Sequence, residues 1–256
     1  MSTASLPVLM YHAVHNQRSP ISVTPQDFRQ HMRWLKEGGF QVLSTGALVK
    51  ILRQGSSLPS NSLVLTFDDG LECLYWNVYP VLREFGFTAT VFLVSGYCGR
   101  LNNWPGQPDG IPSLKLLNWE QIREMDEDGI EFGAHSVSHP RLDRLSQVEV
   151  EIELTESKLE IEQHLGHEVE VFAYPYGSYD TYVQELAAQI FLGACGTELG
   201  YVNTESDPFT LNRIDVYYFQ RPVLFRSLFS LSGRFFTHVL RGYRKIRASG
   251  DELNRY

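Results

Sequence analysis

The chain has 256 residues, of which 43 % are hydrophobic and 20 % are charged, and its formal net charge is −8. This composition is that of an ordinary globular protein with room for one large core, and the acidic balance argues against nucleic acid as the main partner. Three scattered cysteines, Cys73, Cys98 and Cys195, indicate neither a disulfide framework nor a cysteine metal cluster.

In chain order, short apolar strands alternate with helices. The first half predicts a strand at 7–11, a helix that Thr24 caps and that runs to Gly38, a strand at 40–43, a helix from Ser44 to Gly55, a strand at 62–67, a helix around 72–85 and a strand at 88–94. The second half predicts a long loop over 95–113, a helix at 119–128, a strand at 130–134, a helix from Ser146 to about His164, a strand at 169–174, a helix at 180–191 and a strand at 210–216.

This alternation predicts an α/β protein in which parallel strands are joined by crossover helices. A single closed or nearly closed (β/α) barrel over residues 1–256 fits the number of units best, and an open doubly wound sheet is the alternative. In such barrels the chemistry lies on the loops that follow the C-terminal ends of the strands.

The basic tail, about 217–250, departs from the acidic body. No Asp or Glu occurs from Val216 to Gly250, whereas Arg221, Arg226, Arg234, Arg241, Arg244, Lys245 and Arg247 all fall there. Phenylalanines and leucines interleave with these arginines as in interfacial helices, so we expect a helical tail that contacts a membrane surface. A last barrel helix with a solvated basic face is the alternative.

The N-terminal stretch MSTASLPVLMYH has no basic region and only a short apolar run, so it does not match a signal peptide. No segment has the roughly 18 uninterrupted apolar residues of a membrane span. We therefore expect a cytoplasmic protein that associates with membranes through its tail.

Unusual polar residues follow four of the predicted strands. His12 follows PVLMY, Asp68 and Asp69 follow LVLTF, His135 follows IEFGA, and Tyr174 to Tyr176 follow VEVFA. Since the C-terminal ends of parallel strands meet at one mouth of a barrel, these side chains are expected to converge.

Asp68 and Asp69 repel each other near a core unless something positive compensates them. His135 and His139, four residues apart, suit two imidazoles on one ion, although such a pair can also be purely structural. Two imidazoles and one carboxylate form a facial site with open positions for water, and the second carboxylate can then act as a general base. A calcium loop would need more oxygen ligands than DGLECLY supplies.

The motifs TFDDG (66–70), HSVSHP (135–140) and YPYG (174–177) resemble those of the polysaccharide deacetylases, carbohydrate esterase family 4, which have the distorted (β/α) barrel of the NodB type. The resemblance implies that Asp68 is the catalytic base and that Asp69, His135 and His139 hold one divalent metal ion, zinc by preference. It also implies that Pro175 and Tyr176 form the groove wall, with the Tyr176 backbone N–H on the oxyanion.

The chain departs from the family pattern in two places. Ala173 stands where an arginine usually precedes the third motif, so we expect Arg213 to orient the base instead, with Asp215 beside it. The late leucine-x-histidine motif is also missing. LMYHAV (9–14) resembles the early strand of the poly-N-acetylglucosamine deacetylase branch, in which a histidine supplies the acid, so His12 is the expected acid. A strand-end histidine bonded only to the backbone is the alternative.

The resemblance implies a hydrolase that removes acetyl groups from N-acetylated amino sugars of a polysaccharide or its precursor, with an N-acetylated glycan as partner and no nucleic acid. Two alternatives stay open. The enzyme could act on a lipid-linked sugar or a small non-sugar amide, or the chain could be a catalytically silent glycan-binding member.

Overall fold

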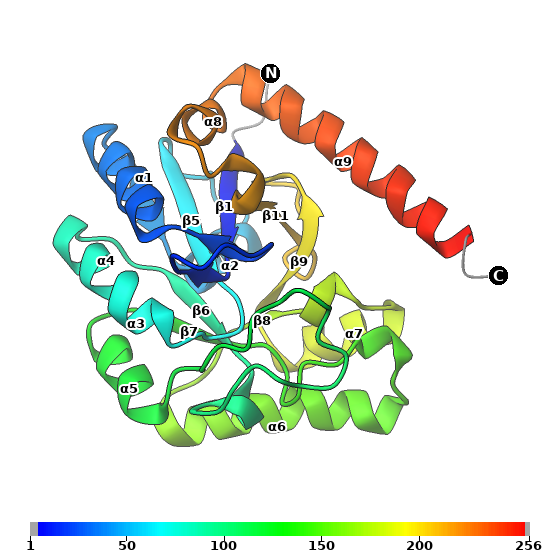
Figure 1. Ribbon diagram of the computed structural model, residues 1–256. Coiled ribbons are helices and arrows are strands. Elements are labelled where there is room, and N and C mark those ends of the chain that lie inside the picture. The colour runs from blue at the N-terminus through cyan, green and yellow to red at the C-terminus, as the bar shows by residue number, and fades with distance from the viewer. Residues whose placement is uncertain (1–4, 254–256) are drawn as a thin grey trace.

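The computed structural model describes the fold of residues 5–253 and the side-chain surroundings of residues 5–243. Seven parallel strands form a closed barrel (Figure 1), as expected. In order around the barrel they are β1 (Ser5–Tyr11), β5 (Ser62–Phe67), β6 (Thr90–Leu93), β7 (Glu131–Ala134), β8 (Val171–Ala173), β9 (Gly193–Leu199) and β11 (Leu211–Asp215). The barrel closes because β1 pairs in parallel with both β5 and β11.

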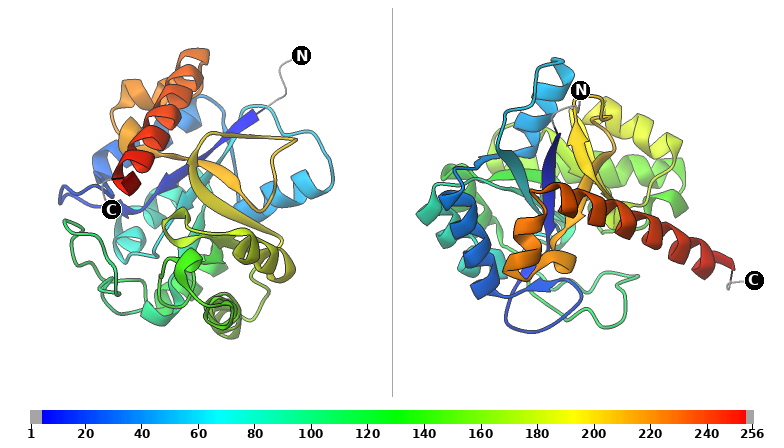
Figure 2. Two further views of the ribbon diagram at one scale, coloured as in Figure 1. Left: turned by 90° about the vertical axis from the view of Figure 1, so that its right-hand side faces the viewer. Right: turned by 90° about the horizontal axis from the view of Figure 1, so that it is seen from above.

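Helices surround the barrel (Figures 1 and 2). They are α1 (Pro25–Glu37), α2 (Thr45–Arg53), α3 (Cys73–Asn77), α4 (Tyr79–Phe85), α5 (Trp119–Glu127), α6 (Gln147–Leu165), α7 (Thr181–Ile190), α8 (Pro222–Ser227) and α9 (Leu231–Leu253). The predicted caps are confirmed: the side chains of Thr24, Ser44 and Ser146 each accept a backbone N–H at the start of α1, α2 and α6.

The helix expected around 72–85 is instead two short helices, α3 and α4, which meet at Val78. Pro80 lies in the first turn of α4, where its missing N–H costs no hydrogen bond, but it could not continue a helix that began at Cys73. The expected strand at 40–43 forms as β4 (Gln41–Leu43), which pairs with the first residues of β5, at 62–64, and is not part of the closed barrel.

Strand β9 was not predicted. Its buried half, GACG, has no β-branched or aromatic residue, so it carries no strand signal in the sequence. The small residues are needed for close packing: a Cβ on Gly193 would lie 2.5 Å from Val49 and 2.8 Å from the Pro208 carbonyl oxygen. A short unpredicted strand, β10 (Tyr201–Asn203), pairs antiparallel with β1.

Alternate side chains of the barrel strands point inward and outward. Val8, Val64, Phe92 and Val171 pack together with Leu48 and Val49 of α2. Helix α2 thus closes the N-terminal end of the barrel with apolar side chains, which leaves the mouth at the C-terminal ends of the strands for polar groups.

The tail comprises a short 3₁₀ turn, η4 (Val216–Phe219), then α8 and α9. Helix α9 is held to the barrel by Arg234, which donates to Ser5, and by Arg241, which pairs with Glu198 of β9 at 2.7 Å. Its far end extends beyond the barrel in Figure 1 and in the right-hand view of Figure 2. The side chains of Arg244, Lys245 and Arg247 lie outside the described residues.

None of the helices in the described part of the chain combines the length and the apolar character needed to cross a bilayer.

Candidate metal centre and active site

Three predicted ligands converge at the mouth of the barrel. Asp69 follows β5, and His135 and His139 lie in the loop that follows β7. The Asp69 Oδ1 atom is 3.8 Å from His135 Nε2 and 3.4 Å from His139 Nε2, and the two Nε2 atoms are 3.2 Å apart. Two ligand atoms that bind one zinc ion tetrahedrally at about 2.1 Å are about 3.4 Å apart. The three atoms therefore have the spacing of ligands around a single ion.

Hydrogen bonding prepares His135 to donate a lone pair. Its Nδ1 atom lies 2.7 Å from the Ala173 carbonyl oxygen, which can only accept, so Nδ1 carries the hydrogen and Nε2 is left unprotonated toward the other ligands. Ala173, the position at which the family's arginine is missing, thus contributes through its backbone.

Burial keeps both imidazoles neutral, the form that binds metal. Burial lowers the pKa of His135, although Asp68 and Asp69 oppose this shift. Burial and the neighbouring His135 hold the pKa of His139 well below its usual value. Burial also raises the pKa of Asp69. A buried carboxylate and two neutral imidazoles, with no cation among the three, are a donor set that fits a divalent ion.

The loops that carry these ligands are strained. Among the described non-glycine residues, positive φ occurs at Asn61, Asp69, Ser136, His139 and Tyr176. All but Asn61 lie in the three motif loops. Such backbone angles cost of order 1–3 kcal/mol each and persist where the surrounding structure fixes them, typically at functional sites. The segment 135–139 is a loop.

Asp68 is buried and is held by Arg213 of β11. The guanidinium donates from Nη1 to Oδ1 at 2.6 Å and from Nη2 to Oδ2 at 2.7 Å. Its Nε donates to the Gly196 carbonyl oxygen at 2.8 Å, which fixes the orientation of the fork. Burial by itself would raise the pKa of Asp68, but the charge and hydrogen bonds of Arg213, together with His135 and His12, outweigh it and hold that pKa below its usual value. Asp68 is therefore ionised at neutral pH.

Asp215, expected beside Arg213, lies at the end of β11 and accepts the backbone N–H of Tyr217 at 3.0 Å, where it caps η4. The pKa of Arg213 is raised, because Asp68 and, to a smaller extent, Cys195 and Asp215 together outweigh the effect of burial. Asp215 thus makes a minor contribution to the charge on Arg213.

His12, the expected acid, lies at the end of β1 with its Nε2 atom 3.9 Å from Asp68 Oδ2. The side chain is about a quarter exposed, at 23 %, so it borders both the carboxylate and the open mouth. His238, the one histidine after residue 167 in the sequence, is exposed on α9, outside the barrel. Of these two histidines, only His12 adjoins the metal ligands and Asp68.

Pro175 is buried and Tyr176 is half-buried in the 3₁₀ turn η3 (Pro175–Gly177), directly after β8. The Tyr176 ring packs edge-on against His139, with ring centroids 4.5 Å apart. Trp104, from the long loop after β6, also packs against this imidazole, with ring centroids 4.5 Å apart. Two aromatic rings thus contact His139.

Glu153 of α6 was not predicted to take part. Its carboxylate accepts the backbone N–H groups of Val137 and Ser138, at 2.8 and 2.9 Å, and the Ser138 hydroxyl. It therefore fixes the loop between the two histidine ligands. Nothing in the sequence distinguishes Glu153 from the other glutamates of α6, because only the fold brings it under this loop.

The family model for polysaccharide deacetylase matches residues 55–193 of the chain. These residues contain Asp68, Asp69, both histidine ligands and the YPYG motif.

Individual relatives agree with this match. The chain is 28% identical over 214 residues to YxkH of Bacillus subtilis, which is named as a polysaccharide deacetylase, and the match covers 83% of this chain and 72% of that one. It is 28% identical over 165 residues to the poly-β-1,6-N-acetyl-D-glucosamine N-deacetylase of Staphylococcus epidermidis, over 61% of this chain and 54% of that protein. This chain thus spans only about half the length of the Staphylococcus enzyme.

The fold also matches a solved structure. The deacetylase PplD of Streptococcus pyogenes, in complex with acetate, superimposes with a TM-score of 0.78 at 25% identity. The superposition covers 90% of this chain and all (100%) of that one.

Proposed function

From the premise that this chain belongs to the polysaccharide deacetylase family, hydrolases that act on N-acetyl amide bonds, we propose that it is a metal-dependent N-deacetylase. Its substrates are N-acetylated amino sugars of a polysaccharide or of its precursor. The observation that carries this proposal is the group formed by Asp69, His135 and His139, whose ligand atoms all lie within 4.8 Å of one another, beside an ionised Asp68.

We assign zinc to the site, because the donors are two nitrogens and one carboxylate oxygen at tetrahedral spacing. A divalent ion held there would polarise the acetyl carbonyl and lower the pKa of a bound water. Asp69, His135 and His139 would hold that ion.

The remaining steps are assigned to the chain's own side chains. Asp68, fixed by Arg213, accepts the proton of the attacking water as general base. The Tyr176 backbone N–H donates to the oxygen on which negative charge develops. His12 donates a proton to the departing nitrogen, since an amine leaves poorly without one. Each group would act only on atoms at the mouth, where all three residues lie.

The Staphylococcus relative is named for an N-acetylglucosamine polymer, and this supports a glycan of that kind as the substrate. A lipid-linked sugar or a small non-sugar amide would use the same catalytic groups. A catalytically silent binding protein would not need the full set of Asp68, Asp69 and both histidines, so the retention of all of them favours an enzyme.

The deciding experiment measures acetate release from β-1,4- and β-1,6-linked N-acetylglucosamine oligomers, together with the metal content of the purified protein. We expect one divalent ion per chain, acetate release that stops after chelation, and recovery on adding zinc. Protein that retains its metal but releases no acetate from either oligomer or from a lipid-linked N-acetyl sugar would contradict the proposal.

We also propose that the tail contacts an anionic membrane surface. On α9, Leu231, Phe235, Val239 and Tyr243 recur every four residues, and all are exposed, Leu231 by 84 % and Phe235 by 71 %. A stripe at this spacing lies along one side of a helix. The tail sequence also carries arginines and no acidic residue from Val216 to Gly250. This positive charge is complementary to anionic lipid headgroups.

A further inference from the structure

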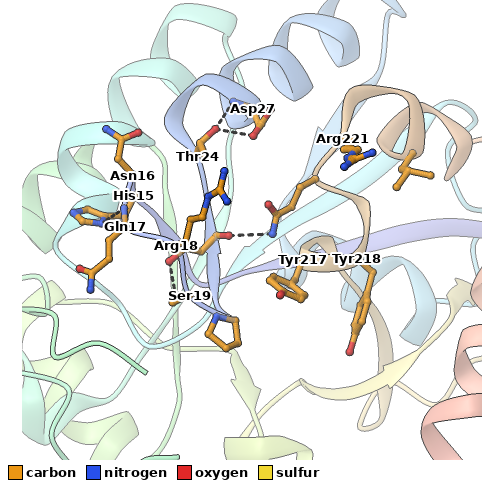
Figure 3. A pocket seen from close by; sticks show the side chains of 14 residues that line it. His15, Asn16, Gln17, Arg18, Ser19, Thr24, Asp27, Tyr217, Tyr218 and Arg221 are labelled. Atoms are coloured by element: carbon orange, nitrogen blue, oxygen red, sulfur yellow. Dashed lines mark hydrogen bonds between the residues drawn. The ribbon is translucent and has the colours of Figure 1, made fainter. Parts of the chain in front are cut away.

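A hollow of about 750 Å³ lies beside the barrel mouth, and we call it the arginine–tyrosine cavity (Figure 3). One wall is the loop 15–20 between the short strands β2 (Ala13–Val14) and β3 (Ser22–Val23), and the opposite wall is η4 with the start of α8. The volume lies within the range of small-molecule sites. None of the three metal ligands lines it.

The cavity nevertheless adjoins the catalytic groups. One wall begins at His15, three residues after His12. Three residues of extended chain span at most about 11 Å, so His15 lies within that distance of His12. The other wall begins at Tyr217, two residues after β11 ends at Asp215. Strands β1 and β11 are neighbours, with Met10 opposite Asp215. The two walls therefore continue the two strands that carry His12 and Arg213.

The two walls are tied together in the folded chain. The Gln220 side chain, which follows η4, donates from Nε2 to the Ser22 carbonyl oxygen in β3 at 3.1 Å. The loop itself is closed by hydrogen bonds between Ala13 and Ile21 and between His15 and Val23. The cavity is thus formed before any ligand arrives, which lowers the entropy cost of binding.

Two guanidinium groups line the cavity, Arg18 from the loop and Arg221 from the start of α8. Neither has a carboxylate within ion-pair distance among residues 5–243, in a protein whose net charge is −8. The one carboxylate that lines the cavity, Asp27, accepts the Thr24 hydroxyl at 2.7 Å in the first turn of α1. The unpaired positive charge in the cavity therefore comes from the two arginines.

The third component of the cavity is aromatic. Tyr217 and Tyr218 lie side by side on the η4 wall, with ring centroids 5.6 Å apart, and are 42 % and 39 % exposed. Amphipathic rings of this kind offer an apolar face, on which a pyranose ring can pack, and a polar edge. Arginine provides a planar fork that matches a carboxylate or phosphate.

We propose that the arginine–tyrosine cavity is a second carbohydrate subsite, which binds a negatively charged sugar of the same glycan whose N-acetyl group lies at the metal centre. The tyrosines contact the sugar ring, and Arg18 and Arg221 bind its oxyanion, which is a phosphate or a uronate. This inference rests on the proposed N-deacetylase function, because it specifies the substrate of that site.

The test uses the full, zinc-loaded chain and three tetramers of N-acetylglucosamine: the neutral one, one with a phosphate at the reducing end, and one with a terminal uronate. Two charge-assisted contacts predict a KM for a charged tetramer about tenfold below that for the neutral one at low salt. The Arg18→Gln/Arg221→Gln double variant should lose this difference while kcat and the KM for the neutral tetramer stay unchanged. Arg226→Gln, an exposed arginine of α8 that does not line the cavity, is the matched control.

A preference for only one of the two charged tetramers supports the subsite and identifies its anion. Equal KM values for all three tetramers would overturn the proposed subsite. The same holds if Arg226→Gln loses the preference for charged tetramers as fully as the double variant does.

Binding of the same tetramers to the Asp68→Asn variant, measured by calorimetry, separates this inference from the proposed function. If no tetramer is deacetylated but arginine-dependent binding of a charged tetramer remains, the proposed function fails and the subsite stands. If the tetramers are deacetylated but neither their KM nor their binding depends on Arg18 and Arg221, the proposed function stands and the subsite fails.

Discussion

Arg213 and Asp68 are 145 positions apart in the sequence, yet the guanidinium and the carboxylate form two parallel hydrogen bonds of 2.6 and 2.7 Å inside the barrel. This pair keeps Asp68 ionised at neutral pH beside the three candidate metal ligands. In the proposed mechanism, Arg213 of β11 takes the place of the arginine that is missing at Ala173.

Replacing Arg213 with Gln should raise the pKa of Asp68, because burial would then act without the compensating charge. Activity requires the ionised carboxylate, so the acid limb of the kcat/KM profile should move to higher pH. Breaking a buried pair typically costs about 3–5 kcal/mol of stability. Arg213→Lys, which keeps the charge but not the fork, should fold and still lose at least about tenfold in turnover. An unchanged pH profile in Arg213→Gln would contradict this role.

The same pair predicts how stability depends on pH. The pKa of Asp68 in the folded protein lies below its value of about 3.9 in the unfolded chain. The ionised Asp68 therefore contributes its full stabilising free energy above the unfolded pKa, and this contribution is lost as the pH falls through the folded pKa. Denaturant unfolding should therefore show that wild type loses stability toward low pH more steeply than Asp68→Asn, for which this contribution is absent. Parallel curves for the two proteins would argue against the shift.

The two adjacent aspartates should fail in different ways. Asp69→Asn should lose the metal, because the amide is a poorer ligand than the carboxylate. Asp68→Asn should keep the metal and lose about 10²–10⁴-fold in turnover, the usual contribution of a general base. Metal analysis and acetate release on both variants provide the check. Equal metal loss in the two would show that the roles are wrongly divided.

His12→Ala should retain its fold and its metal and lose turnover strongly on an N-acetyl sugar. The amine leaves poorly without a proton, and the His12 imidazole borders the mouth at which that proton is needed. The loss should be much smaller on an activated aryl acetate, whose leaving group needs no proton. Near-normal amide hydrolysis by His12→Ala would place the acid elsewhere.

Glu153→Ala should weaken metal binding by about 10–100-fold, as is typical when a group that orients ligands is removed. The physical reason is that the loop 136–138 loses three hydrogen bonds. The matched control is Glu156→Ala, an exposed glutamate one turn further along α6. Zinc competition with a chromophoric chelator measures the effect, and equal affinities in both variants would remove Glu153 from the site.

Phe235→Ser with Val239→Ser should reduce co-sedimentation with vesicles that contain anionic lipid, because both side chains are exposed on the apolar stripe of α9. Leu159→Ser, an exposed apolar residue of α6, is the control. If the unmodified protein does not sediment with anionic vesicles even at low salt, the membrane proposal is wrong.

The sequence alone was sufficient to predict the barrel, most of its elements and the convergence of Asp69, His135 and His139. Apolar strands followed by polar residues determine which groups lie at the mouth, because the C-terminal ends of parallel strands meet there. The helix caps at Thr24, Ser44 and Ser146 could also be predicted, because each depends only on residues three positions apart in the sequence. Strand β9 could not be predicted, because its GACG half has no residue that favours strands, and Gly193 is required by its packing against Val49.

Only the tertiary structure decided the contacts that join distant segments. Glu153 is one of many glutamates in α6 until the fold brings it under the loop between the histidines, and Arg18 and Arg221 become one site only because β1 and β11 are neighbours. Arg213 could be suspected from the missing arginine at Ala173, but its fork geometry depends on Gly196 in the unpredicted strand β9. Local patterns specify elements and their ends, whereas hydrogen bonds between segments far apart in the chain depend on how strands order around the barrel, and no short stretch of sequence encodes that order.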